Sequence, residues 1–226
     1  MKRDVITSTI AIIVFTVLLG LVYPLLITGV SQVAFPGNAN GQKLYVNGKL
    51  VGSKIIGQSF KKPVIEKNGK PKEEEEELVT EPVAKYFQSR PSATEGGAYN
   101  AAASTFSNRG PNSKATAEAD LENIKAYLEM NKPYDPTLTV AKIPVDAVNT
   151  SASNLDPEIS QANAWIQAHR VAVKRGLRLG VVDGLIAKYT DSRGLGFSGE
   201  PGVNVLELNL ALDRGHTGQS PGSGGK

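Results

Sequence analysis

The sequence predicts an α+β protein, in which one N-terminal transmembrane helix is followed by a single extracytoplasmic mixed α/β domain. Two observations lead to this fold class. Apolar residues are concentrated near the N-terminus, and the remaining chain combines short strand-like segments with amphipathic helical segments. We therefore divide the 226 residues into an anchor (1–35), a domain of ordinary size (36–213) and a disordered, glycine-rich tail (214–226).

The anchor is predicted from a long uncharged segment. No charged residue lies between Asp4 and Lys43, and residues 5–33 are mainly Ile, Val, Leu, Phe and Ala. About 20 apolar residues cross the hydrocarbon core of a bilayer, so this segment is long enough to span it. Pro24 lacks a backbone N–H, which predicts a kink near Gly20–Leu21.

A cleaved signal peptide is the alternative interpretation of the same segment. Gly29-Val30-Ser31 is an acceptable small-x-small cleavage site, but the apolar stretch is longer than the usual 7–15 residues and lacks an A-x-A sequence. We therefore favour a retained anchor. In both cases Lys2 and Arg3 keep the N-terminus in the cytoplasm, and everything after Ser31 lies outside.

The domain begins with a predicted β-hairpin. Residues 43–46 and 49–51 flank Asn47-Gly48, a pair that suits the positive φ angles of a type I′ turn. Ile55–Phe60 is predicted as a third strand. Residues 61–82, which include five consecutive glutamates (Glu73–Glu77), are predicted as a charged, solvated insertion loop, because like charges repel one another. A cation site at the glutamates is the less favoured alternative, since such sites alternate ligands with turns.

The segment from Tyr86 to Asn112 is rich in Ser, Ala, Asn, Gly and Pro and has few large apolar residues. Such a composition predicts ordered turns, in which side chains bond to the local backbone. It is long for a simple connection, and long irregular segments in compact domains often bind something.

Three helices are predicted next. The first has an apolar stripe of Ala117, Leu121, Ile124 and Leu128, the second is capped by Ser160 and stops at Gly176, and the third spans Val182–Tyr189. Ile143–Val148 is predicted as a short strand or extended turn. At Leu206–Leu212, leucines alternate with Glu207, Asn209 and Ala211, which favours a strand and leaves a helix open.

Composition excludes several kinds of site. With no cysteine, the chain has no disulfide and no thiolate ligand, and the two histidines leave little for a metal centre. His169 lies in a predicted helix and His216 in the tail, so a catalytic triad is not expected. The net charge of +3 is too small for a nucleic-acid binder. Acid–base candidates are carboxylates in turn-rich segments, which more often serve as caps: Asp146, Asp156, Asp191 and Glu200.

Several segments resemble one family, the C subunit of the Kdp-type potassium-transporting P-type ATPase (KdpC). They are the N-terminal span, Gly52–Gln58, Tyr86–Ala93, Tyr99–Ser104, Ser107–Pro111, Val145–Val148, Leu155–Ser160 and Gly199–Asp213. Three features depart from the family pattern: Thr105-Phe106 replaces a glycine pair, Glu158 stands where histidine is common, and residues 61–82 look inserted. We interpret Ile56-Gly57-Gln58 as a turn rather than part of a nucleotide site, because no phosphate-binding loop is present.

The resemblance implies a non-catalytic accessory subunit of an ATP-driven potassium-import complex in the bacterial inner membrane. Its partners would be the channel-like potassium-binding subunit and the P-type ATPase subunit, with room for a small single-span subunit. ATP and Mg²⁺ would belong to the P-type subunit, with no cofactor or metal bound by this chain. The alternatives are a stand-alone, membrane-tethered binding or sensor domain and a tethered hydrolase that uses Asp146, Asp156 and Glu200.

Candidate interface or structural residues come from the span and from the polar motifs, while no catalytic residue is assigned. Small and hydroxyl residues of the span would pack against partner helices, and the polar segment of residues 90–112 would contact the ion-conducting subunit. The candidates are Thr16, Gly20, Pro24, Gln58, Arg90, Pro91, Ser92, Tyr99, Asn100, Asn108, Gly110, Glu200 and Asn204.

Overall fold

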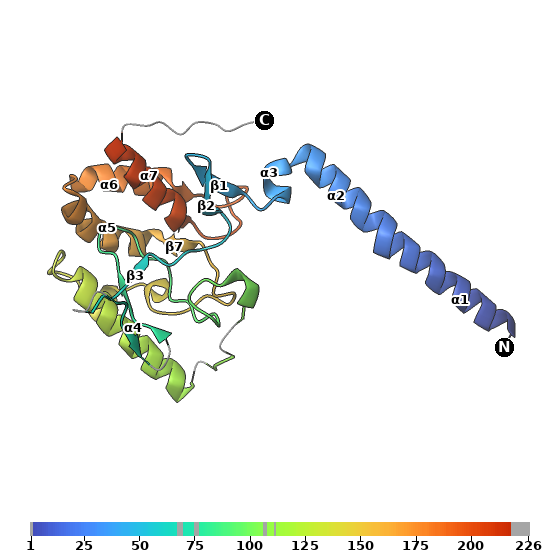
Figure 1. The fold of residues 1–226 in the computed structure, drawn as a ribbon, viewed down its shortest axis with the longest axis horizontal. Coiled ribbons are helices and arrows are strands. Elements are labelled where there is room, and N and C mark those ends of the chain that lie inside the picture. The colour runs from blue at the N-terminus through green and yellow to red at the C-terminus, as the bar shows by residue number, and fades with distance from the viewer. Residues whose placement is uncertain (1, 67–69, 75–76, 106–107, 111, 218–226) are drawn as a thin grey trace. The chain divides into compact units, whose positions relative to one another are not determined.

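The computed structural model describes residues 2–66, 70–74, 77–105, 108–110 and 112–217. Its chain forms two compact units, Met1–Ser53 and Lys54–Lys226 (Figure 1). An apolar helix near the N-terminus is followed by a mixed α/β domain, which agrees with the predicted order of elements.

The first unit begins with a continuous helical segment made of α1 (Lys2–Val17), a π-helical turn (Leu18–Val22) and α2 (Tyr23–Ala34) (Figure 1). This 33-residue stretch is the one helix in the described part of the chain that is long and apolar enough to cross a membrane. The hydroxyls of Thr7, Ser8 and Thr9 donate to carbonyls four residues earlier, so these polar side chains are satisfied within the helix.

Near the kink predicted at Gly20–Leu21 the helix contains a π-helical turn, Leu18–Val22, which ends two residues before Pro24. The N–H of Tyr23 donates to the carbonyl of Leu18, five residues earlier, where a regular α-helix would use four. Proline has no N–H to offer the carbonyl four residues before it, and a widened turn is one way in which a helix absorbs that loss.

The hairpin at the end of this unit follows the sequence prediction. After a short helix, α3 (Pro36–Ala39), strands β1 (Lys43–Val46) and β2 (Lys49–Ser53) pair antiparallel. Asn47 and Gly48 have φ angles of 50° and 76°, which are the positive values that a type I′ turn requires.

The predicted third strand at Ile55–Phe60 is wrong. Lys54 and Ile55 lie in a turn and residues 57–60 belong to no strand, while the N–H of Gly57 donates to the carbonyl of Leu155, in a loop, over 2.8 Å. Extended sequences form strands only where a neighbouring strand is available. Regular pairing begins later, at β3 (Lys61–Pro63).

The segment predicted as a solvated loop contains two short antiparallel pairs. Strand β3 pairs with β6 (Thr80–Pro82), and β4 (Glu73–Glu74) pairs with β5 (Glu77–Leu78). The prediction of a loop is therefore wrong for these residues, although β3 and β6 are exposed along their length. Part of the glutamate run, residues 75–76, lies outside the described residues.

The core of the second unit lies against a three-stranded antiparallel sheet. Its order is β7 (Glu158–Ser160), β9 (Gly202–Asn204), β8 (Thr190–Asp191). Helices α5 (Gln161–Arg175), α6 (Leu179–Lys188) and α7 (Val205–Thr217) supply most of the buried apolar side chains, together with Phe87. A smaller cluster around Tyr127, Leu138 and Val148 joins α4 (Lys114–Asn131) to this core.

The three predicted helices are present, and their end signals are confirmed for α5. The Ser160 hydroxyl accepts a hydrogen bond from the N–H of Asn163, and Gly176 has the left-handed φ of 64° expected at a helix end. The stripe predicted for α4 is partly wrong, because Leu121 is 64% exposed whereas Tyr127 and Asn131 are buried.

Some irregular connections in the described residues contain single turns of 3₁₀ helix. They comprise Ala101–Ala103, Val140–Lys142 and Val145–Ala147. A strand at Ile143–Val148 is therefore wrong, and the alternative of a turn is the closer description. Asp146 explains the local geometry, because its carboxylate bonds to the backbone and side chain of Ser160 and so fixes this turn to the start of α5.

The strand predicted at Leu206–Leu212 is also wrong, because these residues belong to helix α7. The side chain of Asn204 accepts from the N–H of Glu207 and caps this helix. Leu208 and Leu212, four residues apart, are buried on one helical face. Helix α7 continues to Thr217, four residues into the segment predicted as a disordered tail, and 218–226 lie outside the described residues.

We predict that Gly57→Ala destabilises the second unit. A Cβ at this position would overlap the ring of Tyr99 and the backbone carbonyl of Asp156, and overpacking of this kind costs about 1–3 kcal/mol. The free energy of unfolding of the full chain in detergent measures the effect. Gly110→Ala is the matched control, since no atom of the described residues, apart from its chain neighbours, lies within 4 Å of its added Cβ, and its φ is not positive. Equal stability of the two variants would contradict the packing described here.

Candidate functional site

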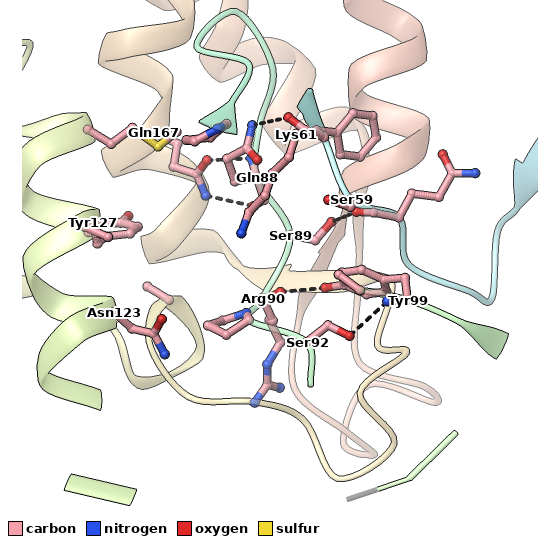
Figure 2. A pocket seen from close by; sticks show the side chains of 18 of the residues that line it. Ser59, Lys61, Gln88, Ser89, Arg90, Ser92, Tyr99, Asn123, Tyr127 and Gln167 are labelled. Carbon is pink, nitrogen blue, oxygen red and sulfur yellow. Dashed lines mark hydrogen bonds between the residues drawn. The ribbon is translucent and has the colours of Figure 1, made fainter. Parts of the chain in front are cut away.

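A cavity of about 330 Å³ opens in the second unit, between helices α4 and α5 and the segments of residues 58–61 and 88–99 (Figure 2). Its wall combines amides, hydroxyls and two basic side chains with a smaller number of apolar groups. The lining residues are Gln58, Ser59, Phe60, Lys61, Thr80, Pro82, Gln88, Ser89, Arg90, Pro91, Ser92, Ala98, Tyr99, Asn123, Ala126, Tyr127, Met130, Ala147, Asn163 and Gln167.

Three buried polar side chains from the two helices form one side of the cavity. The Tyr127 hydroxyl donates to the side-chain oxygen of Asn163 over 2.8 Å, and the Gln167 amide donates to the same oxygen over 2.9 Å. Asn163 and Gln167 are both 1% exposed, so burial without these bonds would be costly. Burial also raises the pKa of Tyr127, which keeps its hydroxyl protonated.

The opposite side is an extended segment that Gln167 holds in place. The Gln167 side chain accepts a hydrogen bond from the N–H of Gln88 and donates one to the carbonyl of Gln88, as the backbone of a neighbouring strand would. The side chain of Gln88 in turn donates to the carbonyl of Phe60, and the Ser89 hydroxyl donates to the carbonyl of Gln58 (Figure 2). These bonds keep the segments at 58–60 and 88–90 next to each other.

Arg170, one helical turn beyond Gln167, anchors the whole arrangement although it does not line the cavity. Its side chain is fully buried. It donates to the backbone carbonyls of Ala84 and Tyr86 and to the side-chain oxygens of Asn131 and Gln167. Burial lowers the pKa of this guanidinium to about 10, so it remains charged at neutral pH.

Five of the residues predicted from the sequence line the cavity: Gln58, Arg90, Pro91, Ser92 and Tyr99. Figure 2 shows Arg90, Ser92 and Tyr99 in its lower part. The Tyr99 hydroxyl donates to the carbonyl of Arg90 over 2.7 Å, and the N–H of Tyr99 donates to the hydroxyl of Ser92 over 3.0 Å. Burial raises the pKa of Tyr99 to about 12. These hydrogen bonds therefore fix a turn. Its backbone and the ring of Tyr99 line the cavity.

Arg90 extends from this turn toward a second group of residues. Its guanidinium forms an ion pair of 3.0 Å with Asp156 and donates to the carbonyl of Thr150. The remaining guanidinium atom, Nε, is buried without a partner in the described structure. The pair links the polar segment before Tyr99 to the loop that leads into β7.

The other predicted residues lie away from the cavity. Asn100 caps the turn at Ala101–Ala103, and Asn204 caps α7. Glu200 is exposed and pairs with Arg193 over 2.7 Å. Asn108 has a positive φ of 53° and is exposed, while the carbonyl of Gly110 accepts from the N–H of Ser113 before α4. Thr16, Gly20 and Pro24 belong to the helical segment of the first unit.

Sequence reasoning missed the buried polar residues of α5. Asn163, Gln167 and Arg170 repeat at intervals of four and three residues, so they occupy one helical face. This spacing was a signal in the sequence for buried polar residues. The polar side chains alternate with alanines at 162, 164 and 168, and such a pattern suggests a helix that is closely packed against other chain segments. His169, on the same helix, is half-buried and does not line the cavity.

The carboxylates considered for acid–base catalysis are engaged in structural bonds. Asp146 bonds to Ser160 and to the amide of Asn163, Asp156 pairs with Arg90 and caps the N–H of Glu158, and Glu200 pairs with Arg193. None of the residues that line the cavity is acidic. Among the described residues there is also no group of three or more His, Cys, Asp or Glu placed to hold a metal ion.

Comparison with known proteins assigns the chain to a family. The family model for KdpC, described as K⁺-transporting ATPase, c chain, matches residues 5–214. The chain belongs to the KdpC family. The KdpC match begins inside the apolar helix, so this helix is part of what the family shares.

Individual KdpC relatives agree over almost the full chain. The protein named potassium-transporting ATPase KdpC subunit from Mycobacterium tuberculosis H37Rv is 44% identical over 214 residues, which cover 95% of this chain and all of the relative. The proteins with this name from Koribacter versatilis and Herpetosiphon aurantiacus are 43% and 45% identical, over 94% and 90% of this chain and 95% and 92% of the relatives. The family resemblance inferred from the sequence motifs is therefore confirmed.

We predict that Arg170→Met strongly destabilises the second unit. The change leaves the carbonyl of Ala84 and the side-chain oxygen of Asn131 without their donor, and each unsatisfied buried group costs about 1–3 kcal/mol. The Tyr86 carbonyl loses one of its two donors and keeps the amide of Gln88. The loss of at least about 2 kcal/mol should appear in the free energy of unfolding measured with denaturant. Arg178→Met, at an exposed residue beside α6, is the control and should change stability little.

Proposed function

We propose that this chain is a non-catalytic, membrane-anchored subunit of an ATP-driven potassium-import complex. It assembles and stabilises the channel-like potassium-binding subunit and the P-type ATPase subunit, and a small single-span subunit is a further partner. The observation that supports this most directly is the KdpC match over residues 5–214, which includes both the apolar helix and the domain.

The anchor is the first contact with these partners. The α1–α2 segment exposes its apolar side chains along its length, as a helix surrounded by lipid and other helices requires. Around Gly20 the helix surface is hollowed, and Ala11, Phe15, Thr16 and Leu19 border this hollow. Small residues allow the backbones of two helices to approach closely, so this side would receive a partner helix.

The domain acts on the extracytoplasmic side of the inner membrane. Lys2 and Arg3 precede the span, and basic residues at the start of a span are retained in the cytoplasm. This topology separates the domain from cytoplasmic ATP. Nucleotide and Mg²⁺ are therefore assigned to the P-type subunit, and this chain binds no cofactor of its own.

The bonds that the polar side chains already make support the proposed non-catalytic role. Asp146, Asp156 and Glu200 serve as caps and ion-pair partners, and the half-buried His169 lies outside the cavity. The ordered polar network instead suits a domain that presents a fixed surface to partners.

A stand-alone binding or sensor domain is the second candidate, and the cavity of about 330 Å³ favours it. Cavities of this size, with polar groups at fixed positions, are common small-molecule sites. A sensor of this kind would be recovered without the two large subunits, which distinguishes it from the first proposal.

We predict that purification from membranes in a mild detergent recovers the chain together with two larger subunits, one channel-like and one P-type ATPase. Gly20→Leu should reduce the recovered complex, because a larger side chain fills the hollow on the helix. Val14→Leu is the control, since the helical repeat places residue 14 on the other side of α1. Recovery of a lone monomer from wild-type membranes would contradict the assembly role.

We predict that the domain is accessible from outside the cell membrane. Because the chain has no cysteine, a single cysteine introduced as Lys114→Cys provides a unique label site. Its side chain is exposed on α4, so a membrane-impermeant maleimide should label it in spheroplasts. Lys2→Cys should be labelled only after the membrane is permeabilised. The reverse pattern would overturn the topology.

A further inference from the structure

The loop between β8 and β9 ends in an exposed apolar tip. Gly194 and Ser198 form two backbone hydrogen bonds of 2.8 Å with each other and close a three-residue turn, Leu195-Gly196-Phe197. Leu195 is 90% exposed and Phe197 is 75% exposed. The turn is fixed to the rest of the loop, since the carbonyl of Arg193 accepts from the N–H of Gly196 and the Arg193 side chain pairs with Glu200.

The backbone at the tip is strained at the leucine. Leu195 has a φ of +53°, and this left-handed conformation costs a residue with a Cβ roughly 1–2 kcal/mol. The leucine side chain makes little contact that would compensate within the domain. Strained residues of this kind are usually found where a function requires the geometry.

The loop that carries the tip begins at the edge of the domain where the polypeptide from the anchor continues into the second unit. Lys54, the first residue of the second unit, pairs with Asp191 at the end of β8 over 3.4 Å. Its carbonyl accepts from the amide of Asn204 at the end of β9. The loop leaves β8 after Asp191, so Leu195, four residues on, is at most about 14 Å further along the chain.

The length of the connecting chain limits how far this edge can lie from the membrane. Nineteen residues, 35–53, separate the end of α2 from Lys54, and 20 residue steps span at most about 70 Å when fully extended. The short helix α3 and the β1–β2 hairpin fold much of this length back on itself. A tether of this kind raises the effective concentration of the tip at the bilayer, so weak insertion of two side chains becomes significant.

We infer that Leu195 and Phe197 insert into the outer leaflet of the membrane that holds the anchor, and so provide a second attachment of the domain to the bilayer. Burial of a leucine and a phenylalanine gains roughly 1.5–3 kcal/mol for each side chain. The preformed turn reduces the entropy lost on insertion. Arg193 and Glu200, at the base of the turn, remain at the level of the polar headgroups. This inference rests on the membrane anchor of the proposed function.

The test uses the full chain, without partner subunits, in nanodiscs of phosphatidylcholine with or without brominated acyl chains. Bromine quenches tryptophan that lies among the lipid chains, and the protein has a single tryptophan, Trp165, which is replaced in a Trp165→Phe background. Leu195→Trp in this background should lose about half of its emission in brominated nanodiscs, as expected at the boundary of headgroups and acyl chains. Phe197→Trp should behave in the same way.

Two matched probes separate the possible outcomes. Lys114→Trp, at an exposed residue of α4, should not be quenched, whereas Phe15→Trp in the anchor should be quenched strongly. Quenching at residue 15 without quenching at 195 and 197 overturns the inference and leaves the membrane anchor supported. Absence of quenching at residue 15 overturns the membrane anchor itself. Equal quenching at residues 114 and 195 also overturns the inference.

Discussion

A guanidinium buried without a neighbouring carboxylate joins the main parts of the domain. Within the described structure, the partners of Arg170 are two backbone carbonyls, one asparagine and one glutamine, contributed by the chain before Phe87, by α4 and by α5. A buried charge tolerates little displacement of such partners, because each lost bond leaves the charge uncompensated. Arg170 thus determines where these segments lie relative to one another, and the apolar core fills the space around that arrangement.

The cavity is a consequence of this polar framework. Gln167 bonds at the same time to Arg170 and to both backbone groups of Gln88, so the extended segment is held at a fixed distance from α5. Asn163 connects α5 to α4 through Tyr127 and to the turn before β7 through Asp146. The space between these side chains stays open because hydrogen-bonded amides hold their partners at fixed distances. Apolar side chains would instead move together and fill it.

Local signals in the sequence predicted the parts of the fold that depend on local bonds. The turn at Asn47-Gly48 and the cap at Ser160 require only neighbouring residues, and both were predicted. The helix at 205–217 was missed because Leu208 and Leu212 fit alternation and a helical repeat equally well, and the cap that decides between them, Asn204, lies at the end of β9. Arg90, Ser92 and Tyr99 were found through their motifs, but Gln167 and Arg170 depend on contacts with residues about 80 positions away.

The π-helical turn at Leu18–Val22 changes the rotational phase of the membrane helix. In a regular helix each residue advances by about 100° around the axis, so Thr28, twelve residues after Thr16, would lie about 120° away from it. A widened turn adds about one residue to one turn, so the helix after Pro24 is rotated by about 100° relative to the helix before it. A widened turn takes more residues to complete, so this rotation is opposite to that offset and cancels most of it. Thr16, Gly20 and Thr28 therefore come close to one line, which a single neighbouring helix can follow through both halves of the span.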